Sequence, residues 1–179
     1  GSEMCIRDSV TVKGSNYIPL KIGDDWFLVD SDTTVSTASD LDTGSISNGK
    51  DYYVYACNNS GSLEFKISLN STYPSGFTAD NSRKIGGFHT LCADAGTISG
   101  HSLSGYSAND ILPQSVWDLK HRPACDDTRG KVYDPYLHLW GFIYLASDDG
   151  NGGAQSVYGA TILDTIDWMD MQDRLAKVG

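Results

Sequence analysis

The chain has 179 residues, which is enough to bury a hydrophobic core in one large or two small domains. Its formal net charge is −10, and its 13 Lys and Arg residues are scattered singly instead of forming a basic face, so nucleic acid is not an expected partner. Hydrophobic residues make up 40% of the chain without any apolar run of about 18 residues, so no insertion into a membrane is expected.

Residues 1–9 are predicted to be a tag-like or adapter-like segment. Gly1-Ser2 resembles the remnant of a protease cleavage, and residues 3–9 resemble translated adapter sequence of the kind that enters metagenomic open reading frames. This segment is therefore excluded from the prediction of the fold.

A β-hairpin is predicted near the N-terminus. Residues 17–22 alternate apolar and polar side chains, and the Gly-Asp-Asp run at 23–25 supplies the turn into the apolar run 26–29. Alternation on both sides of such a turn is typical of two antiparallel strands.

Two further strands follow. Residues 52–57 are aromatic and β-branched, and residues 63–69 alternate apolar with polar side chains. The Ser-, Thr- and Asp-rich run 31–50 is either an exposed loop or a weak edge strand. Residues 10–70 are therefore predicted to form a small antiparallel β-domain.

The middle of the chain is punctuated by Gly, Pro, Asn and Ser. This composition predicts a linker over residues 71–84, after which residues 85–92 resume strand character. Residues 111–119 form a compact apolar turn, in which Pro113 is suited to the first position of a single helical turn.

The most apolar ribbon in the chain is residues 130–147. A short strand at 132–133, a turn at Asp134-Pro135 and a stronger strand over 137–145 are predicted, and the apolar content of the second strand favours burial in a core.

A strand at residues 155–162 and a C-terminal helix complete the predicted elements. From Asp164, which can cap the first turn, apolar residues recur at helical spacing. Trp168 and Leu175 of this helix are expected to pack against the apolar ribbon 130–147.

No signature of catalysis or of metal binding is present in the sequence. The four histidines, His89, His101, His121 and His138, lack the spacing of metal ligands, and no Gly-x-Ser-x-Gly or phosphate-binding motif occurs. We therefore predict no catalytic residue, no cofactor and no metal site.

Trp117 and Trp140 are the candidates for stacking on a sugar ring, although a tryptophan in apolar surroundings is more often part of a core. Cys57, Cys92 and Cys125 are expected to be small buried thiols, and one disulfide among them is left open by their spacing.

Several separate segments resemble a family of phage and prophage proteins. The segments, which lie within residues 68–179, are SLNSTYPSGFTADNSRKIGGFHTLC, ILPQSVWDLKHRPAC, GKVYDPYLHLWGFIYLAS, SVYGAT and DWMDMQDRLAKVG. They are similar to tail-fibre receptor-binding proteins, including the variable proteins of diversity-generating retroelements of the major tropism determinant type.

This resemblance implies a mainly β protein, α+β at its C-terminus, in which residues 85–179 are the first part of a C-type-lectin-like domain similar to the formylglycine-generating enzyme fold. It implies a structural and adhesive role in a phage tail tip or tail fibre, and hence a location in the virion. The expected partners are other copies of the chain, as a trimer, and a host-surface receptor or glycan bound through residues beyond 179. The alternatives are a fragment of a formylglycine-generating-type enzyme and a carbohydrate-binding module.

Overall fold

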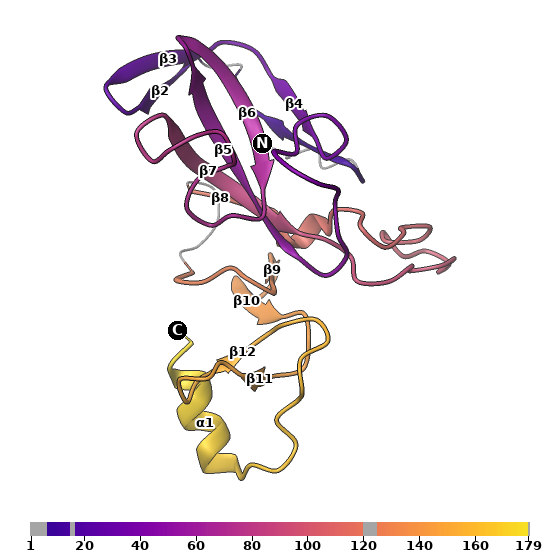
Figure 1. Ribbon diagram of the computed structural model, residues 1–179. Coiled ribbons are helices and arrows are strands. Elements are labelled where there is room, and N and C mark those ends of the chain that lie inside the picture. Colours follow the sequence, from indigo (N-terminus) through magenta and orange to yellow (C-terminus); the bar gives the residue numbers. More distant parts are fainter. Residues whose placement is uncertain (1–6, 15–16, 120–124, 179) are drawn as a thin grey trace.

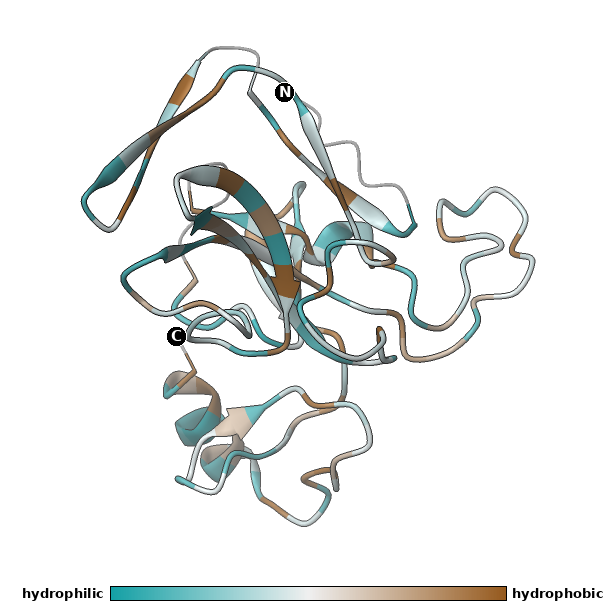
Figure 2. Cartoon of the chain, turned by 45° about the horizontal axis from the view of Figure 1, so that its top comes forward, coloured by the Kyte–Doolittle hydropathy of each residue, from teal (hydrophilic) through white to brown (hydrophobic). Residues whose placement is uncertain are grey.

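A computed structural model describes residues 7–14, 17–119 and 125–178, and it is mainly β with one C-terminal helix, as predicted (Figure 1). Its largest element is a four-stranded antiparallel sheet with the order β6–β5–β7–β8. The strands are β5 (Asp51–Asn59), β6 (Ser62–Ser68), β7 (Ser82–His89) and β8 (Trp117–Asp118). Figure 2 shows hydrophobic and hydrophilic residues alternating along strands of this sheet, which is the pattern of a sheet with one buried face.

Two short ribbons accompany the sheet. The predicted hairpin is confirmed as β2 (Ile18–Ile22) paired with β3 (Asp25–Val29). The other ribbon pairs β1 (Ser9–Val12) with β4 (Thr33–Ser36), so part of the Ser- and Thr-rich run 31–50 is a strand.

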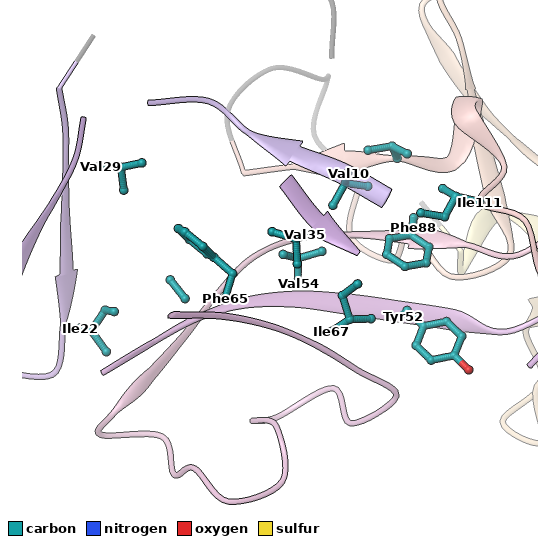
Figure 3. Packing of buried hydrophobic residues seen from close by; sticks show 12 residues of the cluster. Val10, Ile22, Val29, Val35, Tyr52, Val54, Phe65, Ile67, Phe88 and Ile111 are labelled. Carbon is teal, nitrogen blue, oxygen red and sulfur yellow. The ribbon is translucent and has the colours of Figure 1, made fainter. Parts of the chain in front are cut away.

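The main hydrophobic core lies between the sheet and these ribbons. Figure 3 shows Val10 and Val35 of the β1–β4 ribbon beside side chains of the sheet, and Ile22 and Val29 of the hairpin belong to the same cluster. Val35 is fully buried, because its ribbon crosses the apolar face of the sheet. The ribbons therefore form a partial second layer over the sheet.

The four-stranded sheet contains strands from both sides of the predicted linker at residues 71–84. Strand β7 pairs along β5, and β8 pairs with β7 at Gly86 and Gly87. A Cβ atom at Gly86 would lie 2.5 Å from the carbonyl oxygen of Trp117, so glycine allows the two backbones to approach. The strands on the two sides of the predicted linker thus form one sheet.

Part of the predicted tag-like segment also belongs to the fold. Ser9 begins β1, is 4% exposed and pairs with Ser36. The Arg7 guanidinium donates to the carbonyl of Gly105 at 2.6 Å, and the Arg7 carbonyl accepts from the amide of Ile111 at 2.8 Å. Residues 7–9 are therefore structural, and residues 1–6 lie outside the described ranges.

The C-terminal unit, residues 125–178, lies at one end of the sheet (Figure 1). The single helical turn at Pro113 is confirmed as η1, which precedes this unit. The elements in order are η1 (Pro113–Ser115), β9 (Lys131–Asp134), β10 (Leu139–Phe142), β11 (Ser147–Asp148), β12 (Ala154–Gln155) and α1 (Trp168–Ala176). The predicted strand at 155–162 is shorter than expected and is confined to β12 and an isolated bridge at Ile162.

The prediction that the apolar ribbon 130–147 is buried was wrong. Leu139 is 47% exposed and Leu145 is 72% exposed, and β9 and β10 form a two-stranded ribbon separate from the four-stranded sheet. The expected packing of the helix on this ribbon was also wrong, since Trp168 is 71% exposed. Apolar content predicted the strands correctly but not what covers them.

Helix α1 begins later than predicted. Its N-cap is Asp167 instead of Asp164, and the Asp167 carboxylate accepts from the amide of Asp170 at 2.9 Å. Arg174 near its other end pairs with Asp148 at 2.8 Å and so attaches the helix to the β11 region. No helix in the described ranges is long and apolar enough to cross a membrane.

Candidate functional site at the sheet end

A partly buried chain of polar side chains joins the sheet to the C-terminal unit. His89, at the end of β7, is 2% exposed. Its Nδ1 lies 2.8 Å from Asp51 Oδ1 on the paired strand β5, and its Nε2 lies 2.9 Å from the Tyr144 hydroxyl in the C-terminal unit. We call Asp51, His89 and Tyr144 the junction triad.

The sheet register places Asp51 and His89 together. These two residues are direct partners in the antiparallel pairing of β5 with β7. Residues opposite each other in such a pair project side chains to the same face, so the carboxylate and the imidazole meet at the end of the sheet. The His89 amide donates to Ser115 Oγ at 2.7 Å, which fixes the strand end from η1.

The C-terminal unit supplies a second contact to the same carboxylate. The amide of Gly130 donates to Asp51 Oδ1 at 3.0 Å, and the Gly130 carbonyl accepts from the amide of Ile143 at 2.9 Å. Gly130 has a φ of +61°, and a Cβ atom there would lie 1.9 Å from the carbonyl oxygen of Ser156. Glycine is required here both by the conformation and by the close approach.

Aromatic rings extend the contact. The ring of Tyr144 packs on the ring of His89 with centroids 5.5 Å apart and on that of Tyr158 with centroids 5.7 Å apart. Tyr158 in turn covers Gly49, where a Cβ atom would lie 2.7 Å from the Tyr158 ring. The junction therefore combines directional hydrogen bonds with tight packing.

The protonation of the junction triad follows from burial. Burial, followed by the charge and hydrogen bonding of Cys92, raises the pKa of Tyr144 above its usual value. The Tyr144 phenol therefore stays protonated at neutral pH and is able to donate a hydrogen bond to its neighbours. Each member of the triad then has a partner.

This arrangement places a carboxylate, an imidazole and a hydroxyl in line, as some hydrolytic sites do. However, the imidazole is 2% exposed and both of its nitrogens are engaged, so a substrate has no access to it. The geometry suits a structural joint between two parts of the chain.

The two predicted stacking tryptophans are not brought together. Trp117 lies on β8, half-buried, with its ring edge-on to Tyr53 at 6.4 Å between centroids. Trp140 lies on β10, in another sheet, with its ring 5.5 Å from that of Tyr133. Trp117 therefore packs in the small second core that contains Tyr55 and Cys57.

The remaining histidines and the cysteines are dispersed. His101 Nδ1 accepts from the amide of Leu103 at 3.1 Å, His138 Nδ1 lies 3.0 Å from the Tyr133 hydroxyl, and His121 is outside the described ranges. Within the described ranges no group of three potential metal ligands occurs.

The cysteines Cys57, Cys92 and Cys125 are free thiols, so the disulfide left open by their spacing is not formed. Cys57 is buried as expected, whereas Cys92 and Cys125 are half-buried. Burial raises the pKa of the Cys57 thiol to about 12.

The junction triad was missed in the sequence because its members are 38 and 55 residues from His89. One local signal was available. Asp51 directly precedes the aromatic run that begins at Tyr52, and a carboxylate at the start of a buried strand needs a partner.

Comparison with known proteins finds relatives that contain these elements. A protein-family model described as the Mtd second domain matches residues 7–118, which contain β1 to β8. The tail fiber receptor-binding protein of Bordetella phage BPP-1 is 33% identical over 116 residues, which make up 65% of this chain and 29% of that protein.

Solved structures of Major Tropism Determinant variants are similar to this chain. The U1 variant of the Major Tropism Determinant superposes with a TM-score of 0.68 and the M1 variant with 0.66, each at 26% identity over 88% of this chain and 38% of the other. The chain thus spans well under half the length of these proteins. The matched region covers most of the chain, including the whole four-stranded sheet, and the chain therefore belongs to the family of phage proteins that contain the Mtd second domain.

Proposed function

We propose that this chain is a structural part of a phage tail fibre or tail tip, in which the four-stranded sheet supports a receptor-binding module. The observation that carries the proposal is the 33% identity over 116 residues to a tail fiber receptor-binding protein. The protein would then be located in the virion and would act by adhesion instead of catalysis.

The geometry suggests how the support works. The junction triad and the Gly130 amide tie the C-terminal unit to the end of the sheet through hydrogen bonds of 2.8 to 3.0 Å. A receptor-binding surface needs a defined direction relative to the fibre, and a joint of this kind supplies it. The division of the chain that we propose places the sheet domain before the C-terminal unit, near residue 118, instead of at residues 71–84.

The remaining parts of the proposal concern partners. We propose that the C-terminal unit opens a C-type-lectin-like domain, that the chain forms trimers, and that residues beyond 179 contact a receptor or glycan. Trimers would multiply weak contacts into firm attachment through avidity. The exposure of Trp168 and Leu145 supports further covering of the C-terminal unit.

The two alternatives are less well supported. An enzyme of the formylglycine-generating type would need its active site elsewhere, because His89 is enclosed. A carbohydrate-binding module would need an open aromatic platform, whereas both tryptophans are half-buried, with Trp117 packed on Tyr53 and Trp140 on Tyr133.

Immunogold electron microscopy tests the proposal. An antibody raised against the sheet domain should label the tail end of phage particles that carry this gene. Labelling confined to the capsid, or a purified virion without the protein by mass spectrometry, would contradict the tail location. Light scattering after size-exclusion chromatography tests the trimer separately, and a monomeric full-length gene product would refute that part alone.

A further inference from the structure

A groove of about 330 Å³ lies beside the four-stranded sheet. It is bordered by the end of β3, by β4 and by residues 63–66 of β6. We call it the β6 groove. Its β6 residues pair with residues 55–58 of β5, whereas Asp51 of the junction triad is the first residue of β5, at the other end of that strand.

The outer edge of β6 is only partly paired. The amide of Ile67 donates to the carbonyl of Asp40 at 2.8 Å, and the Ile67 carbonyl accepts from the amide of Asp42 at 2.9 Å, so both Ile67 groups face away from β5. Alternate residues of an antiparallel strand face the same side. The backbone groups of Leu63 and Phe65 therefore also face away from β5, and they have no hydrogen-bond partner within the described part of the chain.

The groove runs along this open edge. Four consecutive residues of β6, Leu63 to Lys66, border it. Successive side chains of a strand point to opposite faces, so a groove that contacts a consecutive run follows the edge of the strand and not one face. The unpaired amides and carbonyls of Leu63 and Phe65 are thus presented to the groove.

The walls of the groove define the chemistry that fits. Asp30, Asp40 and Glu64 outnumber Lys66 among its charged residues. Hydrogen bonds from Lys66 and Asn59 hold the pKa of Glu64 below its usual value, so this carboxylate is ionised at neutral pH. Leu28, which is 56% exposed, adds an apolar wall.

We propose that the β6 groove is a strand-addition site for an extended segment of another protein, which pairs with Leu63 and Phe65 and alternates basic with apolar side chains. Main-chain pairing at a sheet edge supplies affinity, and alternate side chains supply specificity. A second copy of this chain is a poor occupant, because its net charge of −10 and its singly scattered Lys and Arg residues do not complement an acidic groove.

The probe is a synthetic hexapeptide of alternating lysine and valine, blocked at both ends and titrated into the full chain while amide signals are followed by NMR. We expect the amides of Leu63 and Phe65 to shift and to become protected from hydrogen exchange. The same peptide with N-methyl groups on alternate residues, which cannot pair, should bind about tenfold more weakly or not at all.

The matched protein variants are Leu63→Pro and Leu63→Ala. Proline is tolerated on an edge strand where the lost amide faces outward, so Leu63→Pro should keep the β5–β6 ladder while blocking the edge. We expect Leu63→Pro to weaken peptide binding about tenfold relative to Leu63→Ala, which controls for the lost side chain. Because the N-methylated peptide is tested on the unaltered protein, the test does not depend on Leu63→Pro folding.

Three results would overturn the proposal. Equal binding of the lysine–valine peptide and its N-methylated version would exclude strand addition. Equal binding of a glutamate–valine peptide would exclude selection for a basic segment. Protection of Leu63 and Phe65 that rises with protein concentration, without any peptide, would assign the edge to a second copy of the chain.

Discussion

Removal of one hydroxyl should loosen the joint between the sheet and the C-terminal unit. In Tyr144→Phe the ring is kept, but His89 Nε2 loses the hydroxyl that lies 2.9 Å away. Because His89 is 2% exposed, water cannot readily replace this partner. A buried polar group left unpaired costs about 1–3 kcal/mol, which should lower the melting temperature by about 3–9 °C in a chain of this size.

The control for this change is Tyr133→Phe, which removes an exposed hydroxyl that lies 3.0 Å from His138 Nδ1. It should change the free energy of unfolding by less than about 0.5 kcal/mol. Urea unfolding measures both variants. Hydrogen exchange at the Gly130 amide adds a local readout, since this amide bonds to the Asp51 carboxylate of the same triad. Equal stabilities, or unchanged exchange at Gly130, would refute the role of the junction triad.

Three further predictions use the same unfolding assay or chemical labelling. Gly130→Ala should destabilise the protein by about 2–4 kcal/mol, because its Cβ would meet Ser156 at a φ of +61°. The control Gly150→Ala, at a φ of +80° with open space around it, should cost about 1 kcal/mol. Similar losses in the two variants would contradict the close approach at Gly130. Trp117→Ala should lower the free energy of unfolding by about 2–4 kcal/mol through lost packing on Tyr53. The control Trp26→Ala, at 67% exposure, should lower it by less than about 0.5 kcal/mol. A Trp117→Ala variant of full stability would contradict the packing role of Trp117. Burial raises the pKa of the Cys57 thiol to about 12, so Cys57 should resist iodoacetamide at pH 8 until the protein is unfolded. Cys92 and Cys125, which are half-buried, should react faster. Early modification of Cys57, found by peptide mapping with mass spectrometry, would refute its burial.

Local patterns predicted local structure well. The hairpin β2–β3 and the strands β5 and β6 follow from alternation and turn chemistry that are complete within a few neighbouring residues. The pairing of β5 with β7 could not be predicted in the same way, because alternation identifies a strand but not its partner. The composition of residues 71–84 therefore could not reveal that the strands on the two sides of this segment pair in one sheet.

Burial was the least predictable property. Residues 137–145 are as apolar as a core strand, yet Leu139 and Leu145 are exposed, because burial depends on a second layer that the ribbon itself does not encode. The candidate site depended on the same missing information. The contact between His89 and Tyr144 follows from tertiary placement, so no spacing in the sequence announces it.

The position of the junction triad has a mechanical consequence. The chain continues toward the C-terminal unit from β8, the strand at one edge of the sheet. The junction triad instead bonds to the ends of the two inner strands, β5 and β7. The C-terminal unit is therefore held at two separate points, which resists torque better than a single tether. If the chain serves in a tail fibre as proposed, a force on the C-terminal unit would load the two inner strands of the sheet along with the covalent connection. The orientation of that unit would then persist until the hydrogen bond between His89 and Tyr144 breaks.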